Sequence, residues 1–159
     1  MAEASAHITL AATPEQVWQL IGGFDSLPDW LPYIPSSALS EGGRVRTLAN
    51  PNGEAIVERL LAFDEDARSY TYAILQAPFP VTGYRSTLRV RDVDGGARVE
   101  WSGRFTPRGV SDEEASGPPW APRDWATATA WRRWRRRFRK AEAQARPAAA
   151  RAPRRRSAR

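Results

Sequence analysis

The chain has 159 residues with no cysteine and one histidine, which suits a single domain of ordinary size. Without cysteine it can form no disulfide framework or thiolate site, and with only His7 available we expect neither a Ser-His-Asp triad nor a zinc site. The net charge of +6 is unevenly spread. Residues 1–115 hold 10 Arg against 16 acidic residues, whereas residues 116–159 hold 13 Arg and 1 Lys against 2.

The sequence contains no stretch near the roughly 20 consecutive apolar residues of a transmembrane helix. Its first ten residues also lack the basic region of a signal peptide. We therefore expect a cytoplasmic protein. A zinc site would have to rely mainly on carboxylates, and we predict neither a metal site nor a cofactor.

The first elements are predicted to be a strand and two short helices. Alternating apolar residues indicate a strand over Ala4–Ala12. The motif TPEQ at residues 13–16 is typical of a helix start, with Thr as the N-cap, Pro at the first helical position and Gln at the capping-box position. Gly22-Gly23 should end this helix. Ser26 should cap one more helical turn, which Pro32 ends.

The middle of the chain is predicted to be a run of strands joined by tight turns. These strands are expected over Ser36–Ser40, Arg44–Asn50, Glu54–Phe63 and Ser69–Gln76. The motif NPNG at residues 50–53 predicts a type I turn closed by a left-handed glycine. This geometry fixes the pairing of the two strands beside it and places Arg46 directly opposite Glu58.

Residues 80–107 predict a second hairpin, because apolar and polar residues alternate on both sides of Asp94-Gly95. If Asp94-Gly95 is the two-residue loop of a type I′ turn, the facing positions are fixed. The facing pairs are then Val90–Val99, Leu88–Trp101, Ser86–Gly103 and Tyr84–Phe105. This face mixes hydroxyl groups, an indole and a glycine gap, a mixture more typical of a cavity wall than of a plain core.

The predicted order is therefore strand, helix, short helix and six strands in a meander, and an open meander needs a cover on its concave face. The motif SDEE at residues 111–114 resembles the capping box of a covering helix. The proline-rich segment 116–122 interrupts it. A helix can resume over Asp124–Arg146, with Trp131 and Trp134 on its inward stripe.

The segments VWQLIGGFDSLPDWLPYI, GRVRTL, GEAIVERLLAFDEDARSYTY and YRSTLRV…VEWSGRF occur in an order that resembles the polyketide cyclase/dehydrase branch of the START/Bet v-type helix-grip superfamily (SRPBCC). The resemblance covers residues 3–115. It implies an α+β helix-grip fold, in which a curved seven-stranded antiparallel sheet and two short helices grip a C-terminal helix. It also implies an apolar ligand cavity lined by Arg46, Glu58, Tyr72, Tyr84, Ser86 and Trp101.

The chain departs from the family pattern after residue 115. We expect a ligand-binding domain over residues 1–115, a proline-rich loop with an atypical Trp/Arg-rich helix over residues 116–146, and a disordered basic tail over residues 147–159. The basic end has two interpretations. It is either an arm that binds nucleic acid or an anionic membrane, or an end read out of frame from GC-rich coding DNA.

Three functions remain open from the sequence. The first is binding of a small hydrophobic or aromatic ligand, lipid-like or polyketide-like. The second is an enzyme of the cyclase or dehydratase kind that uses the Arg, Glu and Tyr groups, for which no catalytic residue is assigned. The third is binding through the tail. Arg46 and Glu58 either face a ligand or form a structural pair. Trp30 is a candidate ligand-binding lid residue, or it wedges the short helix onto the sheet.

Overall fold

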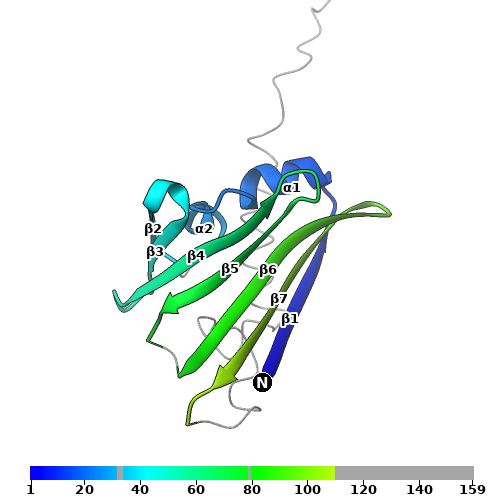
Figure 1. Ribbon diagram of the computed structural model, residues 1–159. Helices are drawn as coiled ribbons and strands as arrows, with labels where there is room; N and C mark the ends of the chain where they lie inside the picture. Colours follow the sequence, from blue (N-terminus) through cyan, green and yellow to red (C-terminus); the bar gives the residue numbers. More distant parts are fainter. Residues whose placement is uncertain (32–33, 79, 110–159) are drawn as a thin grey trace, which may run out of the picture.

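The computed structural model describes residues 1–31, 34–78 and 80–109, and within these ranges it contains one seven-stranded sheet, two α-helices and one 3-10 turn. The elements, in chain order, are β1 (Ala2–Leu10), α1 (Pro14–Ile21), α2 (Leu27–Trp30), β2 (Ser36–Ser40), the 3-10 turn η1 (Glu41–Gly43), β3 (Val45–Ala49), β4 (Ala55–Asp64), β5 (Ser69–Gln76), β6 (Val81–Val93) and β7 (Gly96–Pro107). The predicted order of elements is confirmed, with boundaries that differ by up to two residues. The sheet is curved and antiparallel, as predicted (Figure 1).

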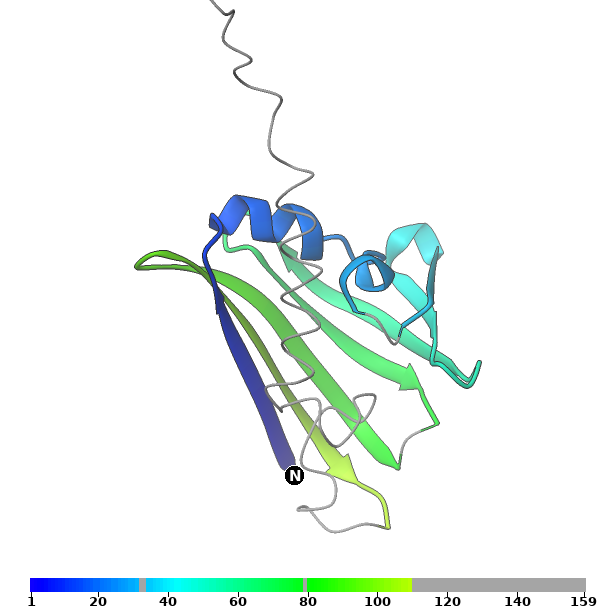
Figure 2. The same ribbon diagram turned by 180° about the vertical axis from the view of Figure 1, so that it is seen from behind.

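The strand order across the sheet is β1-β7-β6-β5-β4-β3-β2, so the six strands from β2 to β7 form a meander. The first strand, β1, pairs with β7 at one edge of the sheet. Both ribbon views place α1 and α2 along one end of the sheet (Figures 1 and 2). We call the face with the buried side chains the inner face, and the opposite face the outer face. Because side chains alternate in direction along a strand, successive residues lie on the inner face and the outer face in turn.

The helix α1 begins where its sequence predicts. The hydroxyl of Thr13 accepts a hydrogen bond from the Gln16 backbone N–H (3.2 Å), and the Gln16 side chain accepts one from the Thr13 N–H (3.0 Å). Val17, Trp18 and Ile21 form part of its buried face. The helix ends at Gly22, where an added Cβ would lie 2.6 Å from the Trp18 ring, so the tryptophan leaves room only for glycine.

The turn between β3 and β4 has the predicted geometry. Gly53 has a φ of +81°, and the backbone N–H of Asn50 donates to the carbonyl of Glu54 across the turn (3.0 Å). The register that follows pairs Arg46 with Glu58, as predicted. The turn motif thus places two charged residues side by side on the inner face.

The turn between β6 and β7 has the predicted register but not the predicted type. The pairs Val90–Val99, Leu88–Trp101 and Ser86–Gly103 are confirmed. A type I′ turn needs positive φ at both central residues, and Asp94 does not have it, whereas Gly95 has a φ of +80°. The type I′ prediction is wrong because the glycine alone takes the left-handed conformation, which strains a residue with a Cβ.

The predicted pair Tyr84–Phe105 is also corrected. The β6–β7 register shifts between Thr82 and Arg85, where Gly83 adopts a φ of +63°. An extra residue at this bulge moves Tyr84 out of direct register with Phe105. Their rings still stack, with centroids 5.8 Å apart.

The predicted cover of the inner face lies outside the described residues, as do the loop and tail segments 116–146 and 147–159. Among residues that the structure does describe, no helix has the length and apolar character needed to cross a bilayer.

Candidate functional site

All seven residues predicted to line a ligand site are buried, each less than 10% exposed. They come from α2 and from five strands: Trp30, Arg46, Glu58, Tyr72, Tyr84, Ser86 and Trp101. The structure divides them into two neighbouring groups. One is built around Arg46 and Glu58, the other around Trp101, and Tyr72 belongs to both.

The first group centres on a buried ion pair. The Nε of Arg46 lies 2.6 Å from the Oε2 of Glu58, and the two side chains are 0% and 1% exposed. The Nη1 of Arg46 also donates to the backbone carbonyl of Phe24 (2.7 Å). Phe24 follows α1, so this bond connects the loop after the helix to β3, which lies near one edge of the sheet.

Aromatic rings surround the guanidinium group. Its carbon lies 4.3 Å from the ring centre of Phe24, 4.9 Å from that of Tyr72 and 5.8 Å from that of Tyr70. Rings at these distances attract a cation through their negative faces. The charge of Arg46 is therefore balanced by one carboxylate and three ring faces rather than by water.

Two polar atoms of this group remain without a hydrogen-bond partner in the described part of the chain: Nη2 of Arg46 and the hydroxyl of Tyr70. The guanidinium acts electrostatically on the Tyr70 phenol, but no bond of good geometry joins the two. Buried polar groups are rarely left unsatisfied, so a pair of such atoms in one place calls for an explanation.

Phe24 and Tyr70 were not predicted from the sequence to belong to the site. Tyr70 could have been assigned from the sequence, because it lies two positions from Tyr72 on the same strand and therefore on the same face. Phe24 could not, since it lies in a loop whose position depends on how α1 packs.

Burial controls the ionisation of these groups. It raises the pKa of Glu58 above its ordinary value, although the adjacent Arg46 opposes the rise. Burial alone would lower the pKa of Arg46, but the Glu58 carboxylate and the two tyrosines raise it overall. Burial also raises the pKa of Tyr70, and raises that of Tyr72 well above its usual range. Both phenols are therefore neutral hydrogen-bonding groups at pH 7.

The second group is a pair of tryptophans bonded to tyrosine and serine. The Nε1 of Trp101 donates to the Tyr72 hydroxyl (3.1 Å), and the ring of Trp30 packs on Trp101 with centroids 5.7 Å apart. The Nε1 of Trp30 donates to the hydroxyl of Ser26 (3.3 Å). Ser26 was predicted to cap α2, but its side chain makes no capping bond and holds Trp30 instead.

The expected gap beside Gly103 is filled. A Cβ at this position would lie 3.0 Å from the Tyr84 hydroxyl and 3.3 Å from the Ser86 hydroxyl. The Ser86 hydroxyl donates to the backbone carbonyl of Ser102 (2.7 Å). The prediction that Gly103 leaves open space for a ligand is wrong, because the glycine makes room for the Tyr84 ring.

The inner face thus has a polar corner, formed by Arg46, Glu58 and Tyr70, beside an aromatic wall. The wall is a series of neighbouring rings, with centroid distances of 6.1 Å from Tyr70 to Tyr72, 6.3 Å from Tyr72 to Tyr84 and 5.8 Å from Tyr84 to Phe105. Across the described ranges, no three His, Cys, Asp or Glu side chains lie close enough together to hold a metal ion. Such a surface can match an apolar or aromatic molecule that carries a single polar group.

Comparison with known proteins bears on the family and the fold. Residues 1–149 match the sequence model of a family described as polyketide cyclase/dehydrase and lipid transport. The matched span includes residues 116–149, which were predicted to lie outside the ligand-binding domain. A search of curated protein sequences gave no significant match.

Solved structures extend the comparison. The chain is 51% identical to the protein XoxI from Bacillus cereus, with 91% of this chain and 95% of that one covered and a TM-score of 0.71. It is 50% identical to an uncharacterised protein from Bacillus thuringiensis, with 88% and 98% covered and a TM-score of 0.74. The Zhui aromatase/cyclase from Streptomyces sp. R1128 shares the fold at 18% identity, with 93% and 98% covered and a TM-score of 0.65.

Proposed function

Because the chain belongs to the polyketide cyclase/dehydrase and lipid transport family, we propose that it binds a small apolar or aromatic ligand against the inner face of its sheet. The ligand is lipid-like or polyketide-like, and its polar group lies at the corner formed by Arg46, Glu58 and Tyr70. The aromatic wall receives its apolar part.

The observation that carries this proposal is the pair of unsatisfied polar atoms beside the ion pair. Arg46 Nη2 and the Tyr70 hydroxyl are both buried, and neither has a partner among the described residues. Leaving such atoms unbonded costs roughly 1–3 kcal/mol each. A ligand carbonyl or hydroxyl oxygen that accepts bonds from both would remove that cost.

The charge state of the corner selects the polar group. Glu58 already balances Arg46, so a ligand carboxylate would bring a second negative charge into a buried site. A neutral carbonyl, phenol or hydroxyl group avoids this charge. The preferred ligand is therefore uncharged at the end that reaches Arg46.

Binding is favoured over catalysis because the inner face offers few groups for proton transfer. Glu58 is its one buried carboxylate among the described residues, and Arg46 engages it. The pKa values of Tyr70 and Tyr72 are raised, which suits hydrogen-bond donors better than general bases. A cyclase activity would have to rely on Arg46 and these phenols to polarise a substrate carbonyl.

A ligand screen on the full chain tests the proposal. Native mass spectrometry with fatty acids, fatty alcohols and polycyclic phenols should show one bound molecule, with uncharged polar ends preferred. Tyr70→Phe should weaken binding about threefold to tenfold, the effect of one hydrogen bond. Thr71→Val is the matched control, because it removes a hydroxyl from the outer face of the same strand and should leave affinity unchanged. Equal effects of the two variants, or no retained ligand, would contradict the proposal.

A further inference from the structure

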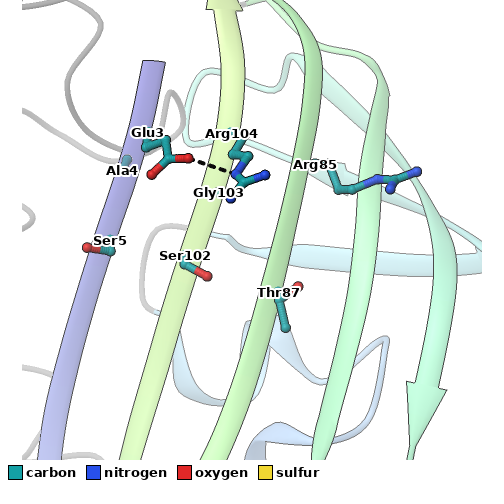
Figure 3. A pocket seen from close by; sticks show the side chains of 8 residues that line it. All are labelled: Glu3, Ala4, Ser5, Arg85, Thr87, Ser102, Gly103 and Arg104. Carbon is teal, nitrogen blue, oxygen red and sulfur yellow. Dashed lines mark ion pairs between the residues drawn. The ribbon is translucent and has the colours of Figure 1, made fainter. Parts of the chain in front are cut away.

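The outer face carries a separate hollow of about 370 Å³ over β1, β6 and β7 (Figure 3). Its lining consists of Glu3, Ala4, Ser5, Arg85, Thr87, Ser102, Gly103 and Arg104. Arg85 and Thr87 alternate along β6 with the buried Tyr84 and Ser86, so the hollow lies on the opposite side of the sheet from the proposed ligand site. Its volume falls in the lower part of the range for small-molecule sites.

A row of hydroxyl groups crosses this face. Ser5 pairs with Ser102, Ser102 with Thr87, and Thr87 with Thr71, so four neighbouring strands each contribute one hydroxyl. The hydroxyls of Thr71 and Thr87 are 2.8 Å apart. Three members of this row line the hollow, where they can donate hydrogen bonds to a bound molecule.

Like charges face each other beside the hydroxyl row. Arg85 lies directly opposite Arg104, and Arg91 directly opposite Arg98. Facing like charges destabilise a sheet, so the fold alone gives no reason for these two pairs. Figure 3 shows the Arg85 side chain pointing away from Arg104, as repulsion between them predicts.

The neighbouring acids neutralise only part of this charge. Glu3 pairs with Arg104 (2.8 Å) and Glu100 with Arg91 (2.8 Å), whereas Arg85 has no ion-pair partner among the described residues. Half of the ten arginines in residues 1–109 lie on the outer face of β6 and β7, although that segment as a whole contains 13 acidic residues. Positive charge is thus concentrated on the outer face of β6 and β7, the two strands that supply most of the hollow's lining, in a segment that is otherwise acidic.

We propose that this hollow binds the phosphate group of a small, hydroxyl-bearing phosphate monoester. Arg104 approaches the phosphate from one side, Arg85 turns back over the hollow to approach it from the other, and Ser5, Thr87 and Ser102 donate hydrogen bonds to it. The anion relieves the repulsion between the two arginines. A tetrahedral phosphate has enough acceptor oxygens for this set of donors, whereas a planar carboxylate has fewer. The remaining volume accommodates the organic part.

NMR titration of the full-length chain tests the site, with ribose 5-phosphate, inorganic phosphate and ribose as probes. Ribose 5-phosphate should shift the amide signals of residues 3–5, 85–87 and 102–104, and should bind at least severalfold more tightly than inorganic phosphate. Ribose should not bind. The proposal is overturned if inorganic phosphate binds as well as the ester, or if the shifts are confined to residues after 109.

Two variants on β6 distinguish binding at the hollow from general electrostatic attraction of the phosphate to the arginines. Arg85→Gln and Arg91→Gln each remove one positive charge from the outer face of β6, but only Arg85 lines the hollow. Arg85→Gln should weaken ribose 5-phosphate binding about tenfold or more, and Arg91→Gln less than about twofold. Arg85→Gln should also leave the melting temperature unchanged or raised, because it removes one of two like charges at facing positions. Equal losses of affinity in both variants would overturn the proposal.

Discussion

Arg46 and Glu58 face each other across β3 and β4, and both side chains of their 2.6 Å ion pair are buried. Phe24, Tyr70 and Tyr72 surround the guanidinium, so the pair depends on the loop after α1 as well as on the sheet. Taking two charges out of water is costly, and hydrophobic residues of similar volume often serve stability as well or better. An ion pair kept in such a position therefore favours a role beyond stability.

Breaking this pair should be strongly destabilising. Glu58→Gln leaves the Arg46 charge buried without its carboxylate and should lower the free energy of unfolding by about 3–5 kcal/mol. The matched control is Glu41→Gln, which breaks the exposed pair between Glu41 and Arg59 (2.8 Å) and should cost less than about 1 kcal/mol. Urea unfolding of both variants measures the difference, and equal costs would show that burial does not matter here.

Replacing both partners together separates stability from binding. Arg46→Met with Glu58→Leu removes both charges and keeps similar volume, so the double variant should be about as stable as the parent chain. It should nevertheless lose the preference for ligands with a polar end. A double variant that keeps this preference would assign the pair a structural role only.

A methyl group at Gly103 should disturb the aromatic wall. The Cβ of Gly103→Ala would lie 3.0 Å from the Tyr84 hydroxyl and 3.2 Å from its ring, so the ring must move. We expect a loss of about 1–3 kcal/mol in the free energy of unfolding and a changed near-ultraviolet circular dichroism spectrum. Adding Tyr84→Phe removes the shortest contact and should recover part of the loss, whereas simple additivity of the two changes would argue against this contact.

Alkaline pH should weaken the fold through the buried tyrosines. Their pKa values are raised above the ordinary value of about 10, so the unfolded chain loses its phenolic protons first as pH rises. The stability that the neutral phenols contribute is complete below that ordinary value and declines above it. Urea midpoints between about pH 9 and 11 should therefore fall, and Tyr72→Phe should fall less steeply. Equal slopes for the two proteins would contradict the assignment to Tyr72.

The sequence predicted the pairing of Arg46 with Glu58 because a turn motif determines which strand positions face each other. The same reasoning gave the β6–β7 register from Asp94-Gly95, although the turn type was wrong. A two-residue loop sets the register whichever of its residues takes the positive φ.

Features that depend on three-dimensional packing could not be predicted from the sequence. Nothing in the local pattern places Phe24 against Arg46, since that contact depends on how α1 packs against the sheet. The bulge at Gly83 on β6 lies next to Tyr84, the residue whose ring fills the gap at Gly103 on β7. A period-two pattern assumes a regular ladder and therefore misses both.

The most direct test of the proposed function is a crystal structure of the full chain with the ligand that the mass-spectrometric screen retains. We predict that the ligand lies on the inner face, with its polar oxygen about 3 Å from Arg46 Nη2 or the Tyr70 hydroxyl and its apolar part against the aromatic wall. A ligand bound elsewhere, with Arg46 and Tyr70 unchanged and untouched, would contradict the account.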